Sequence, residues 1–193
     1  MASVTLSPSS AATIGSTGKA WSSPTNILAS DDVRSVQLSV STVAADNDYL
    51  EAYFDFSAGI ASIDTIDGFE MTTEGSLSGS GGVPVYETVQ LISSSGVGIG
   101  DNVADGSNHG GSDTTKTWGG PTDDLNFGGD ADTVRAPTFG LRLRFVAITS
   151  PRNMRIDHVT MKVYFTAGVG GGGVQRAAAA GCCGSRGDIA GGC

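Results

Sequence analysis

The sequence is poor in the residues that carry most catalysis and most nucleic-acid binding. Only two histidines, His109 and His158, occur among its 193 residues, and histidine is the side chain best suited to acid–base chemistry near neutral pH. The 11 basic residues are outnumbered by 20 acidic ones, which gives a net charge of −9. Because this sign of charge opposes binding to phosphates and to anionic lipid, we expect neither a nucleic acid nor a membrane as a partner.

Enzyme and targeting signals are also missing. The segment GSTGKA (15–20) fails as a phosphate-binding loop, because Thr13 stands where the motif needs its first glycine and Ala20 follows the lysine. His158 lies in an expected strand, and His109 lies in DGSNHGG, where we expect a solvated loop side chain. No apolar run approaches the roughly 18 residues of a membrane span, and the N-terminus lacks the parts of a signal peptide. We therefore expect no enzyme and no cofactor, and synthesis in a cytoplasm.

What the sequence does contain is glycine, at 29 residues, and period-two alternation. In YLEAYFDF (49–56), Leu50, Ala52, Phe54 and Phe56 fall on one side, against Tyr49, Glu51, Tyr53 and Asp55. In VRSVQLSVSTV (33–43) the pattern places Val36, Leu38 and Val40 inward. The alternation predicts an all-β fold, an antiparallel β-sandwich or jelly roll of about eight strands. A slip in parity between Ile156 and Val159 predicts a β-bulge.

The chain divides into three parts by composition. Residues 1–19 form an N-terminal extension or first strand, residues 20–166 the β-sandwich domain, and residues 167–193 an extended tail rich in glycine, alanine and cysteine. Within the sandwich, residues 97–135 form a long irregular stretch. A stretch of that length usually has a function or contains short strands.

All three cysteines, Cys182, Cys183 and Cys193, lie in the tail. An odd count leaves at least one thiol unpaired within the chain, and the adjacent pair is poorly disposed to form a bridge with each other. Intermolecular disulfides are the favoured interpretation, ahead of free thiols and of a metal site, because zinc usually requires four ligands at another spacing. Such cross-links would form after the protein leaves the reducing cytoplasm.

The long stretch 97–135 is acidic. Clustered carboxylates suit hard cations, so a calcium site made by Asp101, Asp105, Asp123 and Asp124 is one interpretation. No EF-hand spacing is present, however. The favoured interpretation is a solvated acidic loop without a bound metal.

The order of several motifs resembles a β-sandwich domain found repeatedly in structural proteins of tailed bacteriophages. The matching residues are Trp21 and Asn26 in an initial turn, Ile66 and Gly68 in a strand, the loop 119–125, and the closing strand 157–165. The resemblance covers about residues 20–166. This sequence departs from the usual pattern at Phe69, where an aliphatic residue is usual, and in DDLNFGG, which lacks a second tryptophan. The resemblance implies a structural or adhesive module and no enzyme.

Two functional hypotheses follow. The first is a virion structural protein of a tailed phage, a capsid decoration or cement protein or a neck or tail accessory, lying on the outer surface of the particle. Its partners would be copies of itself, as a homo-oligomer such as a trimer, and other virion structural proteins, with disulfides through the tail. The alternative is a carbohydrate-binding adhesin module at a fibre or tail tip, with Trp118 and Tyr86 as glycan-stacking platforms. An accessory module of a secreted enzyme is a third, weaker interpretation.

Overall fold

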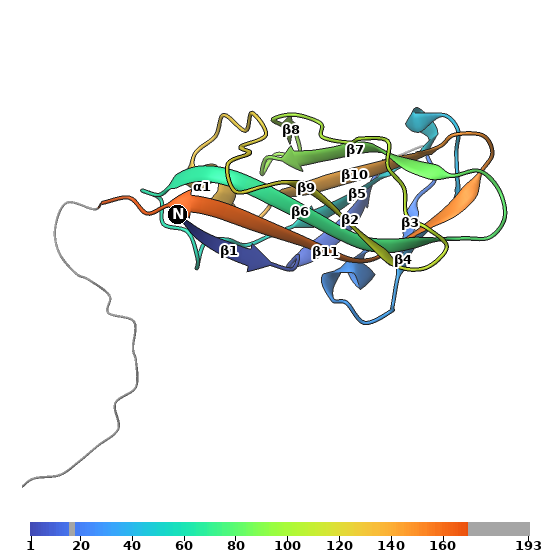
Figure 1. The fold of residues 1–193 in the computed structure, drawn as a ribbon, viewed down its shortest axis with the longest axis horizontal. Coiled ribbons are helices and arrows are strands. Elements are labelled where there is room, and N and C mark those ends of the chain that lie inside the picture. Colours follow the sequence, from blue (N-terminus) through green and yellow to red (C-terminus); the bar gives the residue numbers. More distant parts are fainter. Residues whose placement is uncertain (16–17, 170–193) are drawn as a thin grey trace, which may run out of the picture.

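The computed structural model describes residues 1–15 and 18–169. Within this part of the chain, eleven strands form two antiparallel sheets, which confirms the predicted all-β sandwich (Figure 1). The six-stranded sheet has the order β3-β4-β11-β6-β9, with β1 also pairing with β11, and the five-stranded sheet has the order β2-β5-β10-β7-β8. The strands are β1 (Ala2–Leu6), β2 (Ser10–Ile14), β3 (Trp21–Ser22), β4 (Ser35–Val40), β5 (Tyr49–Tyr53), β6 (Thr65–Ser78), β7 (Pro84–Ile92), β8 (Gly98–Ile99), β9 (Thr114–Gly119), β10 (Gly140–Ala147) and β11 (Arg152–Thr166).

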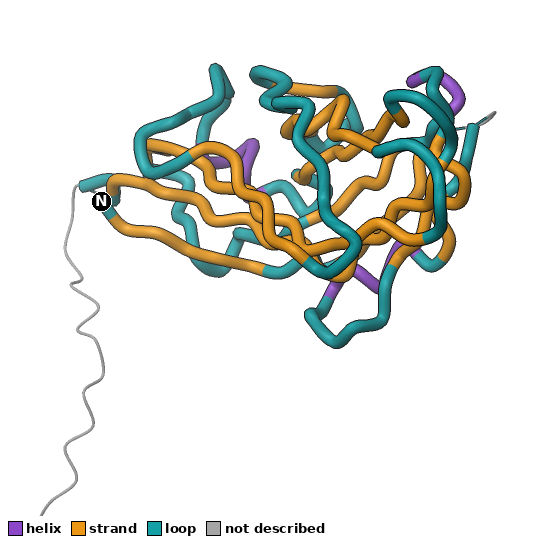
Figure 2. Tube along the Cα trace, turned by 45° about the vertical axis from the view of Figure 1, so that its right-hand side comes forward, coloured by secondary structure: helices purple, strands orange, loops and turns teal. Residues whose placement is uncertain are grey.

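Helical structure in the described residues is limited to short turns between strands (Figure 2). These are η1 (Pro24–Leu28), η2 (Ala44–Asp46) and α1 (Ala131–Arg135). The α1 turn begins at Asp130, whose carboxylate accepts a hydrogen bond from the Thr133 backbone N–H at 2.9 Å. No described helix has the length and the hydrophobicity needed to cross a membrane.

The core lies between the two sheets and is rich in aromatic rings. The alternation expected for β5 and its extension is confirmed, since Leu50, Ala52, Phe54 and Phe56 are at most 1% exposed. In β10, Leu141, Leu143 and Phe145 point inward while the arginines between them point outward. Because consecutive residues of a strand face opposite sides, each of these strands contributes one row to the core and one row to the surface.

The predicted orientation of β4 is wrong. Ser35 and Gln37 are fully buried, whereas Leu38 is 61% exposed. The Gln37 side chain donates hydrogen bonds to the backbone oxygens of Lys19 and Asp48, which satisfies its buried amide nitrogen. A shift in the register against β11 and a positive φ at Ser39 then return Val40 to the core. Polar contacts with a neighbouring loop therefore decide the orientation here.

The last strand contains the predicted bulge, because its register against β6 shifts between Ile156 and His158. Of the two interpretations of residues 1–19, an extension or a first strand, the structure agrees with the second, since this segment contains β1 and β2. Strand β1 pairs with the second half of β11, so the N-terminus and the end of β11 lie at the same end of the molecule (Figure 1). Strand β2 pairs with β5 in the other sheet. The sandwich therefore begins at the first residues and not at residue 20.

The long stretch after β7 contains β8, β9 and α1, and its irregular part covers an edge of the sandwich. Val103 N donates to Val89 O at 2.9 Å, Tyr86 N donates to Ser107 O at 2.9 Å, and Leu77 N donates to Gly110 O at 2.7 Å. These bonds attach the loop 100–113 first to β7 and then to the end of β6. The loop satisfies backbone groups that an uncovered edge would expose.

His109 occupies the centre of this covering loop, and the expectation that it is solvated is wrong. Its side chain is 0% exposed. Nε2 lies 2.6 Å from Tyr86 Oη, and Nδ1 lies 2.9 Å from Thr114 Oγ1. Burial, followed by the nearby Lys116, lowers the pKa of His109 to about 4, so the ring is neutral at pH 7. His158, in β11, is half-buried, and its Nε2 lies 2.9 Å from Ser7 Oγ.

Candidate functional site

The two aromatic residues predicted to stack on glycans are both in the core. Tyr86 is 1% exposed and Trp118 is 6% exposed. Their ring centres lie 4.6 Å apart in an edge-to-face arrangement, and Phe145 covers Tyr86 at 4.3 Å. The prediction is wrong because neither ring has a face that a ligand can reach.

The calcium site, the less favoured interpretation of the acidic stretch, is not formed by the described residues either. Among residues 1–15 and 18–169, no three His, Cys, Asp or Glu side chains come together as metal ligands. The four aspartates instead stabilise their own loops. Asp105, Asp123 and Asp124 each accept a hydrogen bond from the backbone N–H two residues further on, at 3.0 to 3.2 Å. Asp101 accepts one from the Asn126 side-chain amide.

The cysteines of the predicted disulfides, Cys182, Cys183 and Cys193, lie outside the described residues. The cross-links therefore stay a prediction.

The strongest candidate site among the described residues is the outer face of the five-stranded sheet. Register brings its side chains together, since Arg142 of β10 lies opposite Glu51 of β5 and opposite Gln90 of β7. Tyr49 and Tyr53 flank Glu51 on the same face of β5, because they are two residues away on either side. We call this set the platform, and it comprises Tyr49, Glu51, Tyr53, Glu87, Arg142 and Arg144.

At the centre of the platform is an ion pair with little exposure. The Glu51 side chain is 2% exposed and that of Arg142 is 16% exposed. Arg142 donates from Nε and Nη2 to Glu51 Oε1, at 2.8 and 2.6 Å, and Nη2 also donates to Gly96 O at 2.6 Å. The other carboxylate oxygen, Oε2, accepts from the Tyr53 hydroxyl at 2.6 Å. Burial and this bond raise the pKa of Tyr53. Glu51 thus fixes the positions of two neighbours.

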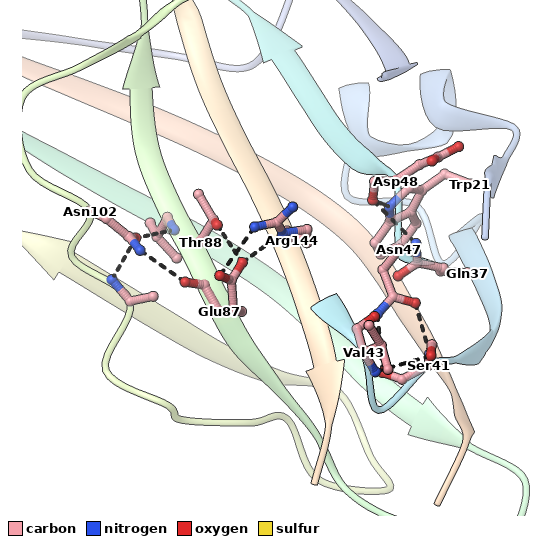
Figure 3. A network of polar contacts seen from close by, with 12 residues as sticks. Trp21, Gln37, Ser41, Val43, Asn47, Asp48, Glu87, Thr88, Asn102 and Arg144 are labelled. Atoms are coloured by element: carbon pink, nitrogen blue, oxygen red, sulfur yellow. Dashed lines mark hydrogen bonds and ion pairs between the residues drawn. The ribbon is translucent and has the colours of Figure 1, made fainter. Parts of the chain in front are cut away.

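A second ion pair of the platform joins Arg144 and Glu87 (Figure 3). Arg144 donates from Nε and Nη2 to the two oxygens of Glu87, at 2.6 and 3.1 Å, and the Thr88 hydroxyl also donates to this carboxylate. The contact with Arg144 lowers the pKa of Glu87 and raises that of Arg144. The guanidinium carbons of Arg142 and Arg144 each lie 4.5 Å from the centre of the Tyr49 ring. Tyr49 therefore holds both arginines by cation–π contact.

Tyr53 is the half-buried aromatic ring of the platform that no described cation or ring covers. Gly140 lies opposite it in the register, and a Cβ at that position would come within 3.2 Å of Tyr53 Cδ1. The Cδ1 edge of the ring therefore lies close to Gly140. Its hydroxyl is bonded to Glu51, so Tyr53 is a half-buried aromatic ring next to the Glu51–Arg142 ion pair.

The network in Figure 3 at the other end of the five-stranded sheet is structural. The Trp21 indole N–H donates to Asp48 O at 3.2 Å, and the same oxygen accepts from the Gln37 amide. Asn47 closes the following turn through bonds with Ser41 and Val43. Trp21 is 3% exposed and its ring centre lies 5.7 Å from that of Phe145, so this group closes one end of the core.

The sequence alternation places the platform residues on the outer rows of two strands, but it does not show that these two strands are neighbours. The alternation in YLEAYFDF and in FGLRLRFVAI already separates Tyr49, Glu51 and Tyr53 from one core row, and Arg142 and Arg144 from another. That these two strands are neighbours is a long-range fact, since they are about ninety residues apart. Only pairing in the sheet shows that the two polar rows form one surface.

Comparison with known proteins gives no family for this chain. No family model matches the sequence, and no curated protein is similar to it. The solved structures that match include three carbohydrate-binding modules. The CBM22-1 xylan-binding domain of Paenibacillus barcinonensis Xyn10C has 8% sequence identity and a TM-score of 0.41, and the match covers 84% of this chain and 87% of that chain. A family 35 carbohydrate-binding module from Clostridium thermocellum has 11% identity and a TM-score of 0.36, with 85% of this chain and 98% of that chain covered. The family 11 carbohydrate-binding module of the C. thermocellum cellulase Lic26A-Cel5E has 12% identity and a TM-score of 0.36, with 86% of this chain and 87% of that chain covered. Similarity at this level does not assign the chain to any of these families.

Proposed function

We propose that this protein is a non-catalytic module that binds carbohydrate on the platform. The observation that supports this is the half-buried ring of Tyr53 beside Gly140, where Glu51 bonds both the Tyr53 hydroxyl and the Arg142 guanidinium. A sugar ring has an apolar C–H face, which packs on an aromatic ring, and oxygens, which accept hydrogen bonds from arginine. The platform offers both within one surface.

The platform is also rigid enough for recognition. Its charged side chains make hydrogen bonds with one another and lie on strands whose inner rows are buried in the core. Side chains that are fixed before binding lose less conformational entropy when a ligand arrives. The position of Glu51, almost fully buried and bonded to two neighbours, supports a surface organised in advance.

The proposal is tested by affinity electrophoresis through gels that contain soluble polysaccharides, followed by calorimetry with the best ligand. Tyr53→Ala is expected to weaken binding roughly tenfold or more, the effect of losing about 1.4 kcal/mol of stacking. Tyr53→Phe retains the ring, so it is expected to retain most of the affinity. The matched control is Lys162→Ala, which removes a cation that lies over the Tyr164 ring on the six-stranded sheet. This variant is expected to bind like wild type.

Two outcomes would contradict the proposal. One is the absence of retardation by every polysaccharide tested, and the other is equal affinity of Tyr53→Ala and wild type. Thermal unfolding of each variant separates a loss of binding from a loss of fold. A location on a phage fibre or tail tip, and assembly into a homo-oligomer, are predictions from the sequence that this experiment does not address.

A further inference from the structure

The hydrogen-bonding groups of the platform are unequally used. Every carboxylate oxygen accepts at least one hydrogen bond, since Glu51 Oε1 accepts two bonds from Arg142 and Oε2 accepts one from the Tyr53 hydroxyl. Both oxygens of Glu87 accept bonds from Arg144. Among the described residues, neither Arg142 nor Arg144 uses its Nη1, and neither atom is among the buried groups without a partner. The groups left for a ligand are therefore mainly donors.

Both arginines lie against the same aromatic ring, since each guanidinium carbon is 4.5 Å from the centre of Tyr49. Each Nη1 carries two N–H groups and no acceptor. An anionic ligand at this surface can accept hydrogen bonds from these N–H groups.

A neutral sugar hydroxyl suits such a surface less well. A hydroxyl both donates and accepts, so it needs an acceptor for its own proton, and the carboxylate oxygens of the platform already accept hydrogen bonds from their neighbours. A carboxylate only accepts, and hydrogen bonds between charged partners are roughly twice as strong as those between neutral ones. Locally, two arginines balance two glutamates, so a ligand carboxylate meets no excess of negative charge. The overall charge of −9 acts over longer distances, where salt screens it beyond about 10 Å.

From this arrangement we infer that the platform recognises an acidic polysaccharide, whose carboxylates accept hydrogen bonds from Arg142 and Arg144 while a neighbouring sugar ring packs on Tyr53. The inference rests on the proposed carbohydrate-binding function and narrows it to uronic-acid polymers. Glu51 then acts as a positioning residue, because it binds Nε and Nη2 of Arg142 and leaves Nη1 for a ligand.

The test compares polymers that differ in charge alone. Polygalacturonate and alginate are the acidic probes, and their methyl and propylene glycol esters are the matched neutral probes. Each acid is expected to bind roughly tenfold more tightly than its ester, the effect of one charge-assisted hydrogen bond. The affinity for the acid, but not for the ester, is expected to fall as sodium chloride is raised.

Variants locate the effect on the platform. Arg144→Gln leaves the partly exposed Glu87 accessible to water and is expected to reduce the preference for the acid over the ester. Arg142→Gln leaves the buried Glu51 carboxylate without its ion-pair partner and can unfold the protein. The double variant Glu51→Gln, Arg142→Gln replaces the ion pair by two neutral amides, so the measurement remains possible if the single variant unfolds. Lys162→Gln removes a positive charge from the other sheet and is expected to keep the wild-type preference.

The outcomes separate this inference from the proposed function. If esters bind as tightly as acids, or if only neutral polysaccharides bind and do so through Tyr53, the inference is overturned and carbohydrate binding stands. If no polysaccharide binds, both are overturned. A preference for the acid that survives both Arg144→Gln and the double variant also overturns the inference, because the charge would then be recognised elsewhere.

Discussion

We expect the free energy of unfolding to decrease at acid pH because His109 is buried, and the pKa of His109 sets the size of this decrease. The folded state holds the pKa of His109 at about 4, mainly by burial, while an unfolded histidine titrates near 6.5. As the pH falls, the unfolded chain therefore binds a proton before the folded chain does. The stability that neutral His109 contributes is complete above about pH 6.5, decreases progressively below it, and is lost below about pH 4. A gap of about 2.5 units at 1.36 kcal/mol each gives a loss of about 3 kcal/mol.

Urea unfolding between pH 7 and pH 4.5 measures this directly. We expect the free energy of unfolding of the wild type to fall steeply in this window, and that of His109→Asn and His109→Gln to start lower at pH 7 but to change much less. His158→Gln, which leaves His109 intact, is the control and is expected to keep the steep dependence. Asp157, whose pKa is raised by burial and by Glu74, opposes the trend equally in all four proteins, so the difference between them isolates His109. Equal pH dependence in wild type and His109 variants, or an NMR titration of His109 centred near pH 6.5, would refute the reasoning.

The remaining predictions concern the floor of the platform and the tail. Gly140→Ala places a Cβ against the Ala52 carbonyl oxygen and the Tyr53 ring, so we expect urea unfolding to show a loss of roughly 1–3 kcal/mol together with weaker carbohydrate binding. Gly120→Ala meets no atom within 4 Å and serves as its control; a Gly140→Ala variant as stable as this control would contradict the assigned packing. For the tail, oxidised protein is expected to run as cross-linked species on non-reducing gels and as monomer after reduction. Replacing Cys182, Cys183 and Cys193 by serine is expected to abolish the cross-links, and a monomer in both lanes for the wild type would count against the predicted disulfides.

The fold was predictable to the extent that burial alone determines it. In β5 and β10, alternation of large apolar and polar residues identifies both faces correctly, because the inward rows contain Leu50, Phe54 and Leu143 and little else competes. In β4 the same rule fails. There, burial of Gln37 is stabilised by carbonyl oxygens from residues outside the strand, and a bulge changes the alternation, which a local pattern cannot reveal.

The candidate site was less accessible to sequence reasoning. Residue type alone suggests Trp118 and Tyr86 as glycan-stacking residues. Large aromatic residues of a β-sandwich more often lie in the core, however, and both of these side chains are buried there. The sequence around His109 is polar and rich in glycine, which predicts a solvent-exposed side chain. In the structure its loop packs on the edge of the sandwich and places the ring beside Tyr86. In each case the decisive contacts join residues distant in sequence, and they depend on the order of strands in the sheets.

One structural relation connects the core to the platform. The outward residues Glu51 and Arg142 alternate with Leu50 and Leu141, which are fully buried. A slip of one residue in the pairing of β5 with β10 would therefore bury charges and expose leucines at the same time. Burial of the inner rows fixes the register, and the register in turn fixes the positions of Tyr53 and the two arginines. The positions of these side chains thus follow from strands more than from loops, so changes in loop length at the ends of the sandwich should alter the platform less than a single insertion within β5.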